Sequence, residues 1–373
     1  MKTLLYFVAE DWYFCSHRLE TAKAVLAEGY RVIVVCNVDK HREVIEKAGI
    51  EVLSVSIERS SLGLLSNIKL LQLLIKLFKN IRPDIVHNVA QKPVLIGSVA
   101  AKLAGIPLVV NALGGMGYIF ISSEPKARIL KALITFIYRR LFNLKGMRLI
   151  LQNRDDFAFF REQIKVQPER LHLVRGAGVN TDDFTQLPFP DFQKVRVTLV
   201  ARMLKDKGIR EFIEAAKLLI PSYPHAEFCL VGSVDLKNPN SFSTAELHQL
   251  CQQSGVVWNG ERSDILNVWR DSHISVLPSY REGLPKSLLE SAAVGRPIVT
   301  TDVPGCREVV EESKNGYLVP LYDTKILTER ISSLLDSPEL CMKMGQRSRE
   351  MAENAFSSYK VNEQILALYK FAE

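Results

Sequence analysis

The 373-residue chain lacks the side-chain patterns that commonly hold metal ions. No Asp-x-Asp sequence occurs, and no group of His and Cys residues has the spacing of zinc ligands. The six cysteines are scattered, without a Cys-x-x-Cys pair, and several lie in apolar runs. This distribution is typical of reduced thiols in the core of a cytosolic protein. We therefore expect no metal and no other cofactor.

Long hydrophobic runs are also missing, since nothing approaches the ~20 apolar residues of a membrane span. The apolar N-terminus could pass for a signal peptide, but Glu10 and Asp11 end it early and no small-residue cleavage site follows. A first buried strand is the better interpretation. With 47% hydrophobic and 24% charged residues, the composition is that of a globular protein of two domains.

Two segments lack carboxylates, and they make the first half of the chain basic. Residues 1–185 carry 26 Lys and Arg against 17 Asp and Glu, whereas the rest carries 22 against 24. The excess lies mainly in 59–82 and 125–148, whose cations include Lys69, Lys76, Lys79, Lys126, Arg128, Lys131, Arg139, Arg140 and Lys145. Basic amphipathic helices of this kind indicate contact with an anionic membrane surface. The alternative is an ordinary crossover helix with its lysines in water. No pattern supports nucleic-acid binding.

Strands and helices alternate along the whole chain. Strands are predicted at 3–9, 31–36, 51–55, 84–88, 107–111, 148–151, 171–174, 195–201, 226–231, 255–258, 273–277, 297–300 and 317–319. First-half helices are predicted near 16–28, 40–48, 64–80, 93–104, 126–143 and 154–163, and a last helix near 355–371. This alternation predicts an α/β protein with parallel sheets and right-handed crossovers. Because residues 186–193 are Pro-rich and aperiodic, we expect two doubly wound, Rossmann-like domains, at 1–185 and 186–355, followed by 356–373.

Two carboxylates eight positions apart stand out in Glu282-Gly-Leu-Pro-Lys-Ser-Leu-Leu-Glu290. Glu282 follows a predicted strand, and Glu290 lies inside the helix that comes next. In an open α/β sheet, ligands bind in the crevice beyond the carboxyl ends of the strands. Gly283 and Pro285 suit a tight turn whose amides face a phosphate at the helix N-terminus. The alternative is a surface helix with two solvated glutamates.

Further strand-to-helix loops accompany this motif. Arg202 and Lys207 follow the strand 195–201, before a helix that begins after Gly208. A planar guanidinium and an ammonium suit the neutralisation of a diphosphate leaving group. The turn Pro304-Gly305 again joins a strand to a helix. All these loops point to one crevice.

Together these residues resemble the retaining glycosyltransferases of family 4, which have the two-domain GT-B architecture. The similarity spans most of residues 171–320, and its order and spacing are specific although each piece is weak. Its segments are Gly178-Val-Asn-Thr-Asp-Asp-Phe184, Ala201-Arg202 with Lys207-Gly208, Leu230-Val-Gly232, Glu282-Gly283 with Glu290, and Pro304-Gly305 with Glu308.

The resemblance implies an enzyme that uses a nucleotide-diphosphate sugar, retains the anomeric configuration and needs no metal. Arg202 and Lys207 would hold the diphosphate, Glu282 would lie near the donor sugar, and Glu290 would bind the ribose. The donor would also contact Gly283, Leu284, Pro285 and Lys286, with Arg262 in the turn beside the base. A transferase without a metal must offset the diphosphate charge with such cations and helix N-termini.

The resemblance assigns the acceptor to the first domain and the nucleotide sugar to the second, with the last helix crossing back to the first. Glycines 114 and 115, with Tyr118, form a loop in which the backbone can approach a substrate. Where relatives commonly have a histidine before these glycines, this chain has Leu113. The first loop, 9–18, is acidic and aromatic instead of Gly-rich, and it brings His17. His87, at the end of a strand, could line the cleft or be structural.

The motif variant resembles transferases of bacterial polysaccharide and lipid-linked glycan assembly. It implies a polyprenyl-diphosphate-linked sugar as acceptor and a cytoplasmic enzyme peripheral to the inner face of the membrane. UDP-N-acetylhexosamine is the expected donor, although GDP-mannose or UDP-glucose would make the same phosphate and ribose contacts. Two alternatives stay open, because a fold never fixes chemistry by itself: a sugar-nucleotide epimerase and a non-catalytic sugar-nucleotide-binding protein.

Overall fold

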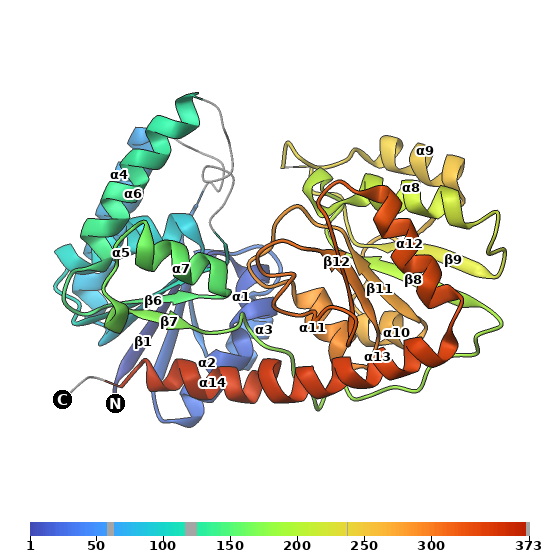
Figure 1. Cartoon of the computed structure of the whole chain (residues 1–373). Coiled ribbons are helices and arrows are strands. Elements are labelled where there is room, and N and C mark those ends of the chain that lie inside the picture. Colours follow the sequence, from blue (N-terminus) through green and yellow to red (C-terminus); the bar gives the residue numbers. More distant parts are fainter. Residues whose placement is uncertain (58–62, 116–124, 237, 371–373) are drawn as a thin grey trace. The chain divides into compact units, whose positions relative to one another are not determined.

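The computed structural model describes residues 1–57, 63–115, 125–236 and 238–370, and the chain forms two compact units (Figure 1). Unit 1 consists of Met1–Ala177 and Ser358–Glu373, and unit 2 of Gly178–Ser357. Each unit is built around one parallel sheet. The predicted architecture of two doubly wound α/β domains is therefore confirmed.

Unit 1 has seven parallel strands in the order β3-β2-β1-β4-β5-β6-β7. The strands are β1 Thr3–Glu10, β2 Arg31–Asn37, β3 Glu51–Ser54, β4 Ile85–Val89, β5 Leu108–Leu113, β6 Met147–Leu151 and β7 Leu171–Leu173. The helices are α1 Asp11–His17, α2 Leu19–Ala27, α3 Arg42–Lys47, α4 Leu64–Ile81, α5 Gln91–Leu103, α6 Pro125–Phe142, α7 Arg154–Glu162 and α14 Ser358–Ala367. The strand order reverses between β1 and β4, which is where such sheets open a crevice for ligands.

Unit 2 has six parallel strands in the order β10-β9-β8-β11-β12-β13. They are β8 Val195–Val200, β9 Ala226–Val231, β10 Val257–Trp258, β11 Ile274–Leu277, β12 Ile298–Thr301 and β13 Gly316–Val319. The helices are α8 Ile209–Leu219, α9 Thr244–Ser254, α10 Ile265–Arg270, α11 Lys286–Ala293, α12 Thr324–Leu335 and α13 Pro338–Met351. The reversal of strand order lies between β8 and β11.

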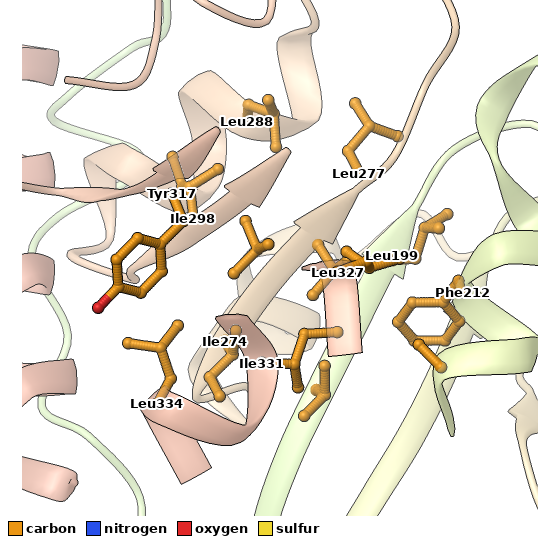
Figure 2. Packing of buried hydrophobic residues seen from close by; sticks show 14 of the residues in the cluster. Leu199, Phe212, Ile274, Leu277, Leu288, Ile298, Tyr317, Leu327, Ile331 and Leu334 are labelled. Atoms are coloured by element: carbon orange, nitrogen blue, oxygen red, sulfur yellow. The ribbon is translucent and has the colours of Figure 1, made fainter. Parts of the chain in front are cut away.

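The core of unit 2 fixes the strands from which its loops emerge. Buried side chains of the sheet pack against helices (Figure 2). Those labelled are Leu199, Ile274, Leu277, Ile298 and Tyr317 from strands, and Phe212, Leu288, Leu327, Ile331 and Leu334 from helices. At roughly 1.5–3 kcal/mol for each fully buried large apolar side chain, such packing holds the strand ends firmly.

The boundary between the units differs from the predicted one at 185. Unit 2 already begins at Gly178, because its helix α13 binds the preceding segment. The guanidinium of Arg349 donates hydrogen bonds to the carbonyl groups of Phe184 and Ala293, at 2.6 and 2.7 Å. The second crossing falls after Ser357 instead of 355. The Pro-rich stretch 186–193 is thus part of unit 2 and does not separate the two units.

A second difference concerns residues 9–18, which were predicted to be a loop. They form the end of β1 and the helix α1, which begins at Asp11. The carboxylate of Asp11 is fully buried and accepts hydrogen bonds from the backbone N–H groups of Asp39 and His41, at 2.8 and 2.9 Å. A buried acidic residue in the first turn of a helix is favourable to the helix dipole, which explains the early start.

The last helix, α14, packs on unit 1. Thr21 of α2 donates a hydrogen bond to Asn362, and the hydroxyl of Tyr369 lies 3.0 Å from that of Tyr6 and 2.5 Å from Nδ1 of His87. The buried contacts of Tyr369 join the end of the chain to β1 and β4, in the middle of the first sheet.

Candidate active site

The central feature of unit 2 is an ion pair at the switch point of its sheet. Lys207 ends a 3₁₀ turn after β8, and Glu282 lies in the loop after β11. Lys207 Nζ lies 2.5 Å from Glu282 Oε1, and the two side chains are only 16% and 13% exposed. The pair therefore joins the two strands between which the sheet reverses its order, in the position that ligands of such sheets occupy.

Two glycines allow the loops to approach closely enough for this pair to form. Gly208 has a φ of +72°, and a Cβ there would lie 2.1 Å from the carbonyl oxygen of Pro278. Gly305 has a φ of +84°, and a Cβ there would lie 2.6 Å from the carbonyl oxygens of Glu282 and Gly283. Any other residue would be strained and would push the loops apart. The three motifs that the sequence singled out thus meet in one place.

Glu290 lies inside α11 and is 7% exposed. Burial raises the pKa of its carboxyl, whereas Lys286, with Nζ 3.4 Å from Oε1, acts in the opposite direction. The indole of Trp269 also acts to lower this pKa. A carboxyl kept in a dry site beside one cation is suited to accept hydrogen bonds from ligand hydroxyl groups.

The turn before α11 is built from Gly283, Leu284, Pro285 and Lys286. Leu284 points into the core of unit 2, and Pro285 precedes the first residue of the helix without a side-chain cap. The side chain at the N-cap of α11 therefore accepts no hydrogen bond from the first backbone N–H groups of the helix. These N–H groups and the helix dipole favour an anion at this position.

The two predicted arginines are each held by a carboxylate. Arg202, after β8, lies 3.0 Å from Asp235, and Arg262 binds Asp264 through two contacts of 2.6 and 2.7 Å. Arg262 follows a turn that is fixed to the neighbouring strand, because the indole N–H of Trp258 donates to the carbonyl of Gly232. Arg202 and Arg262 thus sit on loops of the same sheet edge, but the structure joins neither of them directly to Glu282.

In unit 1, Tyr13 lies beside both His17 and Gly114, although the sequence did not single it out as a site residue. The ring of His17 stacks on Tyr13, with centroids 4.2 Å apart. A Cβ added at Gly114 would lie 3.3 Å from the hydroxyl of Tyr13 and 3.8 Å from the amide nitrogen of Gln152. Gly115 follows with a φ of +126°. The only signal for Gln152 was its position directly after a buried strand, as a polar residue at the carboxyl end.

Of the two interpretations of His87, the structure supports the structural one and excludes its predicted place in the acceptor site. Its side chain is fully buried in unit 1, where Nδ1 pairs with Tyr369 and the ring packs against Tyr6. Burial lowers the pKa of His87 well below its usual value, and the charge of Arg18 acts in the same direction. His87 is a neutral core residue. Tyr118 lies outside the described residues.

The described residues contain no group of three His, Cys, Asp or Glu side chains placed to hold a metal ion. Within the same residues, no helix has both the length and the apolar character needed to cross a membrane. The six cysteines are unpaired, and all but Cys15 are buried. Burial raises the pKa of the Cys36, Cys229, Cys306 and Cys341 thiols to about 12. These thiols are therefore unreactive core residues.

Two family models match this chain, one to each unit. The model of group 1 glycosyl transferases matches residues 181–351, and that of the glycosyl transferase 4-like family matches residues 3–153. The chain belongs to these glycosyltransferases. It contains Lys207, Glu282 and Glu290 in the first match, and His17, Gly114 and Gln152 in the second.

Sequence similarity to curated relatives extends over most of the glycosyltransferase. An N,N'-diacetylbacillosaminyl-diphospho-undecaprenol alpha-1,3-N-acetylgalactosaminyltransferase of Campylobacter jejuni is 29% identical over 90% of both chains. A UDP-Gal:alpha-D-GlcNAc-diphosphoundecaprenol alpha-1,3-galactosyltransferase of Escherichia coli is 27% identical over 83% of this chain and 81% of its own. Among solved structures, HepE of Anabaena, in complex with UDP and glucose, has a TM-score of 0.79 at 18% identity, covering 98% of this chain and 99% of its own. The fold is therefore GT-B.

Replacing Glu290 by glutamine should raise the melting temperature of the glycosyltransferase at neutral pH. Because burial raises the folded-state pKa of Glu290 above its unfolded-state value, the folded protein favours the protonated carboxyl. The contribution of Glu290 to stability is thus complete below the unfolded-state pKa and is lost as the pH rises through the folded-state pKa. The gain from Glu290→Gln should therefore grow between pH 4.5 and pH 8 in thermal unfolding.

The matched control for this experiment is Glu329→Gln, since Glu329 is exposed on α12. It should leave the melting temperature nearly unchanged at both pH values. If Glu290→Gln changed the melting temperature equally at the two pH values, the buried Glu290 carboxylate would not be what lowers stability at high pH.

Proposed function

We propose that this glycosyltransferase moves a sugar from a nucleotide-diphosphate donor to a polyprenyl-diphosphate-linked sugar, with retention at the anomeric carbon and without a metal ion. The pathway is the synthesis of bacterial cell-surface glycans. The observation that carries the proposal is the shielded Lys207–Glu282 pair at the switch point of unit 2, on the loop that leads to Glu290.

The Lys207–Glu282 pair supports the chemistry of the leaving group. In the reaction the bond from the anomeric carbon to the diphosphate oxygen breaks, and a bond to an acceptor hydroxyl oxygen forms on the same face of the sugar. The acceptor proton passes to the leaving diphosphate oxygen. Lys207 is placed to stabilise the negative charge on that oxygen, with Arg202 on the same loop after β8. Glu282 keeps Lys207 oriented and lies beside the donor sugar.

Glu290 provides the second part of the donor site. Its buried carboxyl can accept hydrogen bonds from the two hydroxyls of a ribose, while Lys286 limits the cost of its charge. The uncapped start of α11, with Gly283 and Pro285, faces the phosphates. Arg262 belongs to the turn against which we place the base.

The acceptor and donor classes are supported by the relatives. Those of Campylobacter jejuni and Escherichia coli are named for acceptors linked to undecaprenol through a diphosphate, and the latter for UDP-galactose. The former is named for the transfer of N-acetylgalactosamine. We therefore propose a UDP-activated N-acetylhexosamine as donor.

Replacing Lys207 by alanine should lower kcat by roughly 10²–10³-fold, because one preorganised electrostatic partner of the leaving group is lost. The measurement is release of UDP that depends on a lipid-linked acceptor. Lys205→Ala is the matched control, since Lys205 is exposed in the same 3₁₀ turn. Full activity of folded Lys207→Ala protein would refute the assignment, and UDP release without any transfer product would refute transferase chemistry.

The UDP preference can be measured by thermal shift with UDP, GDP and ADP sugars. A ligand that binds only the folded state raises the melting temperature, by an amount that corresponds to about 2.7 kcal/mol at 100 times its Kd. We expect stabilisation by UDP and by UDP-N-acetylhexosamine. Stabilisation by GDP with no response to UDP would reject this donor.

We also place the enzyme at the cytoplasmic face of the membrane, with α4 and α6 of unit 1 as the contact (Figure 1). Both helices expose large apolar side chains, Leu65, Ile68 and Leu73 on α4 and Leu133 and Phe136 on α6. The same helices carry the exposed cations Lys69, Lys76, Lys79, Arg139 and Arg140, none of which forms an ion pair with a described residue. Exposed apolar groups among unpaired cations suit a surface of anionic lipid.

Changing Arg139 and Arg140 together to glutamate should weaken binding to anionic vesicles, because each basic residue near the surface contributes about 1 kcal/mol. Flotation at low and high salt measures this binding. The control is Lys325→Glu with Lys343→Glu, which makes the same charge change at exposed sites of unit 2. Equal loss in both double variants would indicate a net-charge effect, and no salt-sensitive binding of the wild type would remove the membrane proposal.

A further inference from the structure

The carboxyl edge of the sheet in unit 1 carries a mostly buried glutamine whose amide reaches solvent. Gln152 directly follows β6 and is 6% exposed. Its side-chain amide makes no hydrogen bond with any residue that the structure describes. The polar atoms of this amide are not fully enclosed, so they reach solvent and can bind water or a ligand.

A capping role does not account for this glutamine. The next residue, Asn153, already caps α7, because its side-chain oxygen accepts a hydrogen bond of 2.8 Å from the N–H of Asp156. Asn153 also donates to the carboxylate of Asp156. The start of α7 therefore needs nothing from Gln152.

Gly114 lies directly beside this amide. Leu113 and Leu151 are paired in the register of β5 and β6, so Gly114 and Gln152 leave the sheet next to each other. Gly114 is exposed and has no side chain to fill the position 3.8 Å from the Gln152 amide nitrogen. The amide thus adjoins a surface that a ligand can reach over Gly114.

Tyr13 also lies beside Gly114. Its hydroxyl lies 3.3 Å from the Cβ position of Gly114. The ring is held by His17, stacked at 4.2 Å, and by Trp12, edge-on at 5.6 Å. An ordered aromatic ring beside an amide is a frequent arrangement for binding a sugar, since the ring covers the apolar face and the amide binds the hydroxyls.

We propose that Gln152 is a specificity-determining residue that binds two neighbouring hydroxyls of the acceptor's terminal sugar, over Gly114 and beside Tyr13. The inference rests on the proposed function, because it assigns this subsite to the acceptor of that reaction. A primary amide offers one acceptor and two donors. Its oxygen accepts a hydrogen bond from one ring hydroxyl, and its nitrogen donates one to the neighbouring hydroxyl. Both bonds form only when the two hydroxyls have the right relative orientation, so the amide distinguishes epimers.

The test compares Gln152→Leu with the wild type on undecaprenyl-diphosphate N-acetylglucosamine and on its C-4 epimer, the N-acetylgalactosamine compound. Loss of two neutral hydrogen bonds should raise the acceptor KM roughly 10- to 30-fold and reduce the discrimination between the epimers. The KM for the UDP-sugar and the thermal shift by UDP should stay unchanged. Gln163→Leu is the control, since Gln163 is exposed at the end of α7.

Gly114→Ala gives an independent test, because its added methyl lies 3.3 Å from the Tyr13 hydroxyl and 3.8 Å from the Gln152 amide nitrogen without removing either side chain. The backbone of Gly114 lies outside the left-handed region, so alanine fits its conformation. The acceptor KM should again rise while the donor KM stays constant.

An unchanged acceptor KM in folded Gln152→Leu, or a change confined to the donor KM, would overturn the subsite and leave the proposed function intact. A wild-type protein that transfers sugar to no lipid-linked acceptor would overturn the proposed function, and the subsite with it. A raised acceptor KM in Gln163→Leu as well would show a general effect and reject the role of Gln152.

Discussion

The ion pair between Lys207 and Glu282 depends on close contact between loops that are far apart in the sequence. Lys207 comes from the end of β8 and Glu282 from the end of β11, two strands that are neighbours in the sheet because its order reverses there. Glycines at 208 and 305 let the loops approach to distances that a Cβ would prevent. A cation held in a mostly buried pair keeps its position without bound substrate, so little reorganisation is needed when a charged leaving group arrives. The donor site that we propose for unit 2 depends on this constraint.

The buried carboxylate of Glu290 lowers the stability of the folded protein. The Glu290 carboxyl is buried in α11, and burial raises its pKa, while Lys286 is the cation that the described part of the chain places 3.4 Å from it. A glutamine there would suit the core better. Functional sites commonly contain groups that a protein selected for stability alone would not bury.

Most elements of the fold could be predicted, because buried parallel strands are continuous apolar runs and the helices between them have their own period. The exceptions arose from contacts distant in the sequence. Residues 11–17 became α1 because the carboxylate of Asp11 binds the backbone after β2, and the boundary moved to residue 178 because Arg349 binds the segment before β8. Neither partner lies near the residue whose structure it decides. A local pattern contains no information about such contacts.

For the site, the sequence by itself determined the residue types and their place at the strand ends, and with them the family and the Glu282-to-Glu290 motif. Only the tertiary structure decided which of these side chains meet. It joined Lys207 to Glu282, held Arg202 and Arg262 on carboxylates of their own, and buried His87 against Tyr369. It also brought Tyr13 and Gln152 to Gly114. The physical reason is that strand order fixes which loops are neighbours, and strand order follows from the packing of the whole sheet, not from any one segment.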